Sequence, residues 1–301
     1  MTPPSPYRVF ALLWIGSLLI WWPAIAATLA LALRQDAYRH ILIILPISIV
    51  LIVIEWNRKP SPNIRAGSAL LGLAILIGVA GLKWRRVDIF TGDLRLTLEM
   101  LAVVTWWIGS FAGCFGSRIF RACIFPLLFL LWLVPMPEFA LDHVVFFLQQ
   151  GSASFARLLL ATVGVPVVQD GTTLAIPGLT LEVAQECSSI QSSMMLVVIT
   201  MVLSYLLLRS FWGWTVVTLA AIPLAIAKNG LRVFTLALLG AYVSPGVLSS
   251  PLHHRGGPLF LALALAGVFM LIRGVGWLER RVARSSMGKQ VPPTVSIRRH
   301  D

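Results

Sequence analysis

Long apolar runs, separated by short polar segments, dominate the chain. A helix needs about 20 apolar residues to cross the hydrocarbon core of a bilayer, and runs near this length recur from residue 9 to residue 278. The pattern predicts eight transmembrane helices, at residues 9–33, 41–56, 66–82, 96–114, 119–135, 188–208, 212–243 and 258–278. The predicted fold class is therefore an all-α, polytopic membrane protein. We expect residues 1–285 to form a single membrane domain and residues 286–301 a basic, disordered cytoplasmic tail.

One stretch, from Pro135 to Gln185, is interrupted by polar residues and departs from this pattern. Apolar residues recur at helical spacing from Leu141 to Leu148, with polar residues between them. This spacing predicts a small amphipathic helix on the extracytoplasmic surface. The following segment, GTTLAIPGLTLEV, alternates polar and apolar residues around a Pro-Gly pair, which predicts a β-hairpin.

The composition excludes most other classes of protein. The chain is 58% hydrophobic and only 12% charged, with a mean hydropathy of +0.86, whereas soluble domains carry about 25% charged residues. The net charge of +12 reflects Lys and Arg in short loops and in the tail. Such an excess marks cytoplasmic segments. We therefore expect both termini in the cytoplasm, the lipid bilayer as a partner, and no nucleic acid.

The seventh apolar run contains the most unusual polar group of the sequence. Residues 228–232 read Lys-Asn-Gly-Leu-Arg within the run, and Pro223 precedes them. The run is either one kinked helix or two half-helices that meet at the Lys-Asn-Gly break. Either arrangement places Arg232 in the apolar zone, at a cost of at least about 2.5–3.5 kcal/mol, so a functional role is the first hypothesis. The alternatives are a structural cation paired with Glu182 or Glu186, or a side chain that reaches the headgroups.

Cys187 stands at the outer end of the sixth apolar run, where a helix should begin. Ser188 and Ser189 follow it and are residue types that cap helices. The peptide dipoles of a helix N-terminus favour a thiolate, which is the nucleophilic form of cysteine. The alternative is a small buried side chain. Cys114 and Cys123 flank an inner loop, and for them this structural interpretation is preferred.

Histidines precede the last apolar run and the second one. His253 and His254 lie on the same predicted face as Cys187, and an imidazole can take or give a proton near neutral pH. His40 stands at the outer end of the second run and is expected to line the same cavity. The histidines lack metal-ligand spacing, so we predict neither a metal nor a cofactor.

At these residues the sequence resembles the exosortase/archaeosortase family of membrane cysteine transpeptidase-like enzymes. The similarity runs from residue 37 to residue 260. Four segments follow the family's order and spacing: FPLLFLLWLVPMP, LLATVGVPVVQDGTTLAIPGLTLEVAQECSSIQSS, PLAIAKNGLRVF and HHRGGPLF.

The resemblance implies the site residues. The family's catalytic cysteine corresponds to Cys187, and its arginine, which follows an asparagine, corresponds to Arg232 after Asn229. Its histidine, four residues before a glycine, corresponds to His253, with His254 as the alternative. The family usually has Cys-Ser-Gly where this chain has Cys-Ser-Ser, so the geometry just after the nucleophile differs.

The resemblance also implies substrates, location and mechanism. Similar enzymes act on exported proteins whose C-terminal signal combines a short motif such as Pro-Glu-Pro, a transmembrane helix and a basic end. They lie in the bacterial inner membrane, and the expected active site faces the periplasm. The hypothesis is that Cys187 forms an acyl-thioester, that Arg232 stabilises the oxyanion, holds the thiolate or donates a proton, and that His253 protonates the leaving amine.

Some roles and alternatives stay open at this point. His40, Asn229, Glu186 and Ser188 are expected to support the site, and the acceptor nucleophile is unknown. The competing hypothesis is a non-enzymatic membrane protein, either a transporter that binds an anion at Arg232 or a polysaccharide-export component. A third is a degenerate family member that acts as a chaperone for sorted proteins.

Overall fold

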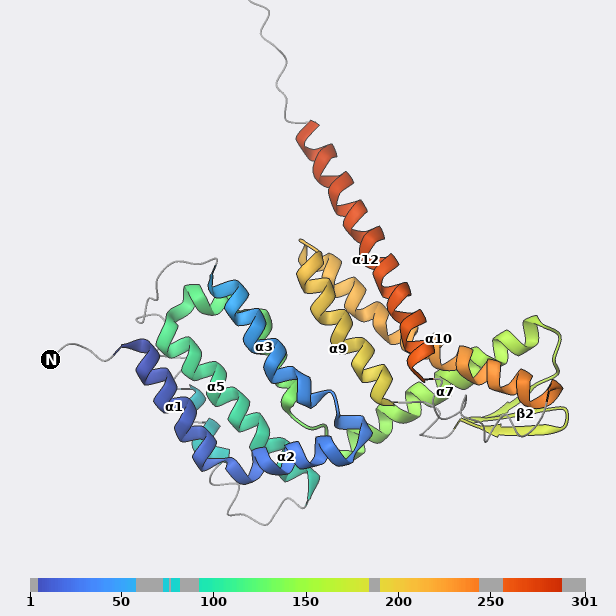
Figure 1. The fold of residues 1–301 in the computed structure, drawn as a ribbon, viewed down its shortest axis with the longest axis horizontal. Helices are drawn as coiled ribbons and strands as arrows, with labels where there is room; N and C mark the ends of the chain where they lie inside the picture. Colours follow the sequence, from blue (N-terminus) through green and yellow to red (C-terminus); the bar gives the residue numbers. More distant parts are fainter. Residues whose placement is uncertain are drawn as a thin grey trace, which may run out of the picture. The chain divides into compact units, whose positions relative to one another are not determined.

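The computed structural model describes residues 5–57, 73–75, 77–81, 92–183, 190–243 and 257–288 (Figure 1). The chain forms two compact units, Met1–Val144 and Val145–Asp301, called here the N-terminal unit and the C-terminal unit. The helix α7 (Glu138–Thr162) contains the boundary between them.

The N-terminal unit is helical throughout its described residues outside the connections. Its elements are α1 (Pro6–Ile20), α2 (Trp22–Arg34), η1 (Asp36–Tyr38), α3 (Ile41–Trp56), α5 (Asp93–Ala122), α6 (Ile124–Phe129) and η3 (Leu130–Leu133). The first predicted span is bent by 73° between α1 and α2. Pro23 explains the break, because its ring has no N–H to donate and clashes with the preceding turn, so the helix starts anew there.

Aromatic rings hold α1 against α5. The rings of Phe10 and Phe111 meet edge to face at 5.9 Å between centroids, and those of Trp14 and Trp107 lie 5.6 Å apart. Trp107 also donates its indole N–H to Ser17 Oγ at 2.7 Å. Aromatic pairs and a satisfied indole therefore stabilise this interface, and the described residues of α1 and α5 include no buried charged side chain.

The chain turns back between the predicted spans at 96–114 and 119–135. A kink at Gly116 (φ 80°) separates two helices within Asp93–Ala122, and Thr97 Oγ1, near the start of the first, donates a hydrogen bond to the carbonyl oxygen of Pro135 at 2.9 Å. The returning segment is divided again at Cys123, and the apolar helix that follows covers only Ile124–Leu133. Ten helical residues rise about 15 Å, half of the hydrocarbon thickness, so this helix is shorter than the predicted fifth span.

The C-terminal unit contains three long helices that pack on one another, α9 (Ile190–Leu207), α10 (Phe211–Tyr242) and α12 (Gly257–Gly288) (Figure 1). Small and branched residues form their common core; these include Leu196, Val217, Ala225, Ala264 and Val268. A short connection joins α9 to α10, which makes the two helices antiparallel. Ser210 caps α10 by accepting a hydrogen bond from the N–H of Gly213.

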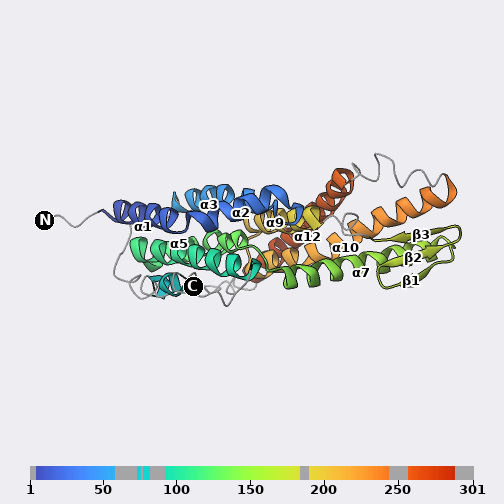
Figure 2. The same ribbon diagram turned by 90° about the horizontal axis from the view of Figure 1, so that it is seen from below.

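A small antiparallel sheet follows α7. Its strands are β1 (Val168–Asp170), β2 (Thr173–Ile176) and β3 (Leu179–Glu182), in the order β1-β2-β3. The predicted hairpin is confirmed as β2–β3, with Ile176 opposite Leu179 and Gly178 at φ 80° in the turn. Figure 2 shows the strands beside the C-terminal parts of α7 and α10, where Leu174 packs with Ala156 and Val233.

The all-α, multi-span fold class is confirmed, with fewer spans in the described residues than predicted. Six described helices are long and apolar enough to cross a membrane, or seven if the bent α1–α2 pair is one span. The predicted span at 66–82 lies largely outside the described residues. The predicted amphipathic helix is present as α7, which is longer than expected and passes the same test of length and composition.

Candidate active site

The Lys-Asn-Gly sequence does not break α10. The helix runs without interruption from Phe211 to Tyr242 and includes Pro223, which settles the choice between one helix and two half-helices. Gly230 has a packing role instead. A Cβ atom there would lie 2.8 Å from Phe155 Cδ1 and 2.9 Å from the Ser152 carbonyl oxygen, so only glycine lets α10 approach α7 this closely.

Two cations and an amide are buried on α10. Lys228 is 5% exposed, Asn229 0% and Arg232 6%. Lys228 and Arg232 are four residues apart and therefore lie one above the other on the same face of the helix. α10 itself contains no acidic residue, and Glu182, one of the expected partners of Arg232, is exposed on β3.

The first turn of α9 binds this part of α10. Lys228 Nζ donates a hydrogen bond to Ser192 Oγ, and Asn229 Nδ2 donates one to Ser193 Oγ at 3.2 Å. At the opposite end of the two helices, Ser204 Oγ and Thr218 Oγ1 are also 3.2 Å apart. The two antiparallel helices are thus joined by polar contacts at both ends of α9 and by apolar packing between these ends.

The position of Arg232 along α10 places it one bilayer thickness from the start of the helix. Phe211, Trp212 and Trp214 begin α10, and tryptophan favours the membrane interface. Arg232 is 21 residues after Phe211, which at 1.5 Å per residue is about 32 Å, close to the thickness of the hydrocarbon core. The residues beyond it, including Val233 and Ala237, pack on the sheet and on α7.

α12 runs antiparallel to α10. Glu279, in the C-terminal part of α12, accepts hydrogen bonds from the N–H groups of Arg209 and Ser210 just before α10, each at 3.2 Å. Further along, Gly267 of α12 lies against Leu224 of α10. The N-terminal end of α12, at Gly257, therefore belongs to the end of the three-helix group that contains Arg232.

The remaining predicted site residues lie outside the described residues: Glu186, Cys187, Ser188, His253 and His254. The lengths of chain that join them to described residues are short. Cys187 precedes Ser192 by five residues, and His253 precedes Gly257 by four.

His40 belongs to the N-terminal unit. Its Nδ1 donates to the carbonyl oxygen of Ala37 at 3.0 Å, its ring meets Trp132 edge to face at 5.8 Å, and its side chain is buried. These contacts fix the ring orientation. Its expected role beside Cys187 stays a prediction. Across the described part of the chain, no three His, Cys, Asp or Glu side chains are close enough together to hold a metal ion.

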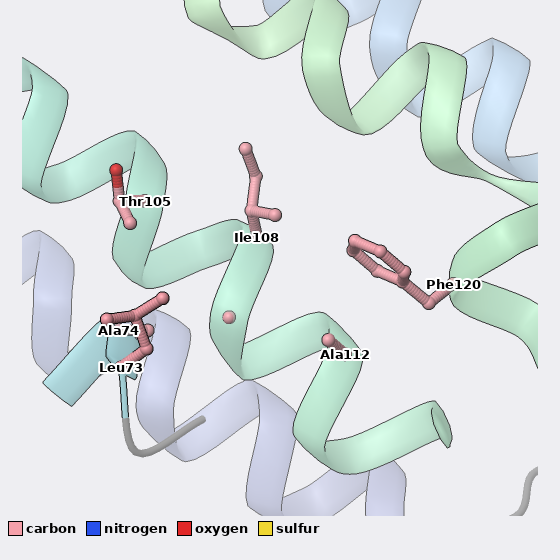
Figure 3. A pocket seen from close by; sticks show the side chains of 7 residues that line it. Leu73, Ala74, Thr105, Ile108, Ala112 and Phe120 are labelled. Carbon is pink, nitrogen blue, oxygen red and sulfur yellow. The ribbon is translucent and has the colours of Figure 1, made fainter. Parts of the chain in front are cut away.

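A small cavity of about 70 Å³ in the N-terminal unit is lined by side chains that are not suited to catalysis (Figure 3). Its lining residues are Leu73, Ala74, Thr105, Ile108, Gly109, Ala112 and Phe120. None of them is titratable, and the Thr105 hydroxyl is their one polar side-chain group. The cavity is present because Gly109 and Ala112 of α5 are small. The buried polar residues of α10 are the better candidate site.

Sequence reasoning singled out Asn229 and Arg232 but not Lys228, Ser192 or Ser193. A lysine in an apolar run signals function as an arginine does, so Lys228 was open to the same argument. The two serines carry a weaker signal, namely an adjacent polar pair at the start of an apolar run. Their match to the adjacent pair Lys228-Asn229 becomes visible only when α9 folds against α10.

One of the comparisons with known proteins found a match. A family model described as transmembrane exosortase matches residues 21–270, which include α10 and most of both units. No curated protein and no solved structure was found to match the chain.

Proposed function

The chain belongs to the transmembrane exosortase family, and from this premise we propose that it is a membrane cysteine peptidase or transpeptidase. Its substrates are exported proteins with a C-terminal sorting signal made of a short motif, one transmembrane helix and a basic end. Cys187 is the nucleophile, Arg232 the cation of the site, and His253 or His254 the acid–base group.

The observation that carries the proposal is the buried polar group on α10. Arg232 is 6% exposed and lies one helical turn beyond Lys228, which binds Ser192 in the first turn of α9. Cys187 precedes that turn by five residues. A buried guanidinium whose helix also binds the segment just after a cysteine supports chemistry at the thiol.

The proposed reaction has two steps. Cys187 gives its thiol proton to His253, Cys187 Sγ attacks the carbonyl carbon of the scissile peptide bond, and Arg232 donates hydrogen bonds to the oxyanion that develops. The C–N bond then breaks, His253 protonates the leaving amine, and an acyl-thioester remains. Water or an acceptor amine attacks the thioester, forms the product and regenerates the thiol. Glu186, Ser188 and Asn229 are proposed to support this geometry.

The antiparallel course of α9 and α10 supports a single face for the reaction. If both helices cross the bilayer, Cys187 before α9 and His253 after α10 emerge on the same side. Arg209, between the two helices, and the basic end of α12 emerge on the other. Basic segments favour the cytoplasm, so we propose a bacterial inner-membrane protein with a periplasmic active site and cytoplasmic termini.

Replacement of Cys187 tests the function. We expect Cys187→Ala and Cys187→Ser to insert normally but to leave a co-expressed substrate with the three-part tail uncleaved, because neither side chain provides a thiolate. The measurement is a gel shift of the substrate. Cys114→Ala and Cys123→Ala are matched controls, since both thiols are buried in the N-terminal unit, and they should cleave normally. Full cleavage by Cys187→Ala would overturn the proposal and favour a transporter or export component.

A further inference from the structure

We propose that Lys228 is a positioning residue for the reaction: its ammonium group binds Ser192 and so fixes the first turn of α9, the turn that follows Cys187. This inference rests on the proposed function. It concerns a side chain that does not take part in the proposed steps of bond making and breaking.

The burial of Lys228 needs an explanation other than packing. The side chain is 5% exposed, within a helix long and apolar enough to cross the membrane. An ionisable side chain at such a place costs free energy, whereas an apolar one would stabilise the same interface. A second cation, Arg232, lies one turn away on the same face, and like charges at this spacing repel each other. Adhesion between the helices therefore does not account for a lysine here.

The hydrogen bonds made by Lys228 and its neighbour explain why a lysine is buried here. Lys228 and Asn229 are consecutive on α10, and each donates to one of two consecutive serines on α9. Two adjacent hydrogen bonds between helices define how far one helix slides or turns against the other, whereas apolar packing such as that around Leu196, Val217 and Ala225 is not directional and specifies the register less strictly. Buried polar pairs that set the register of helices are a known use of such groups.

This register matters because α10 also carries Arg232. The helix that binds the segment after Cys187 thereby holds the proposed oxyanion cation at a fixed offset from the same turn. A shift of α9 along α10 would change the distance between the thiol and the guanidinium. A misplacement of about 1 Å in an active site can lower the rate about a hundredfold.

The test compares variants of the full-length enzyme in lipid vesicles with a substrate that carries the sorting tail. We expect Lys228→Met to lower kcat about tenfold or more with little change in KM, and Ser192→Ala to lower it in the same way. Lys228→Arg, which keeps the charge and its donors, should restore most of the rate. The double variant Lys228→Met/Ser192→Ala should be no worse than the poorer single variant, because both changes remove the same contact.

Two further measurements keep the test decisive. Thr218→Ala, which removes the polar contact at the other end of α9 and α10, should leave kcat unchanged. In a background without Cys114 and Cys123, alkylation of Cys187 by a small maleimide should be slower in Lys228→Met than in the parent, even without substrate.

A wild-type kcat for Lys228→Met, an equal loss in Lys228→Arg, or additive losses in the double variant would overturn the inference. If Cys187→Ala also cleaves substrate, the proposed function itself has failed.

Discussion

The two units of this chain bury different kinds of side chain between their helices. In the N-terminal unit, α1 meets α5 through aromatic rings such as Phe10, Trp14 and Trp107, and Trp107 finds a hydroxyl partner within the unit. In the C-terminal unit, α10 buries Lys228, Asn229 and Arg232. Rings stabilise an interface by contact alone, whereas buried cations cost free energy. The difference supports the C-terminal unit as the one that carries the proposed site.

The largest difference between the units is expected when one arginine in each unit is replaced by lysine. We expect Arg232→Lys to lower the rate of substrate cleavage about a hundredfold or more, because an ammonium lacks the planar set of donors that a guanidinium offers to an oxyanion. The protein should still insert, since the charge and its stem remain. The rate is measured by gel shift with purified enzyme in vesicles.

Arg39 provides the matched control in the N-terminal unit. Its guanidinium pairs with Asp36 at 2.8 Å, and both side chains are exposed. Exposed ion pairs contribute about 0–1 kcal/mol, so Arg39→Lys should cleave at the parent rate. A near-normal rate for Arg232→Lys would show that a simple positive charge is sufficient and would remove the planar-donor role.

An effect of intermediate size is expected where α7 approaches α10 closely, at Gly230. Gly230→Ala places a Cβ atom against Phe155 and against the Ser152 carbonyl oxygen, and overpacking of this kind costs about 1–3 kcal/mol. We expect a lower thermal unfolding midpoint in detergent and a partial loss of activity, because the same stretch of α10 carries Arg232. Gly274→Ala in α12, where nothing lies within 4 Å of the added carbon, should change neither quantity. Equal midpoints for the two variants would contradict the packing role of Gly230.

The smallest effect is expected in the aromatic interface. Trp107→Phe removes the hydrogen bond to Ser17 and should lower the free energy of unfolding by about 1 kcal/mol, while the rate of cleavage per folded molecule stays the same. Trp22→Phe, at a tryptophan that is 60% exposed, is the control and should be neutral. A loss of catalytic rate in Trp107→Phe with stability unchanged would contradict the division of roles between the units.

The sequence allowed the fold class to be predicted because hydropathy alone identifies membrane helices. The hairpin was also predictable, since Pro177-Gly178 stands between two alternating segments and Gly178 adopts the required positive φ. The turn at Gly116 also falls between two of the predicted spans. The division of the returning segment at Cys123 was not predictable, because the residues after Gly116 have the same hydropathy in one helix or in two short helices, and tertiary packing decides between the two.

The site was predictable to the extent that a residue is unusual for its surroundings. Arg232 and Asn229 stand out in an apolar run, and the family resemblance named them as well; that resemblance is confirmed. Ser192 and Ser193 do not stand out, because serine is common in membrane helices. Their partners are 36 residues further along the chain, and a local sequence pattern does not reveal contacts over that separation.

The central claim is that the buried polar group of α10 serves a covalent reaction at Cys187, and mass spectrometry of a trapped intermediate tests it most directly. Enzyme in vesicles is mixed with a substrate that carries the sorting tail, quenched with acid while cleavage is under way, and digested. We expect an added mass on the peptide that contains Cys187, equal to the last digestion peptide of the substrate's N-terminal product, and absent in Cys187→Ala. Cleavage without any adduct on Cys187, or an adduct on Cys114 or Cys123 instead, would contradict it.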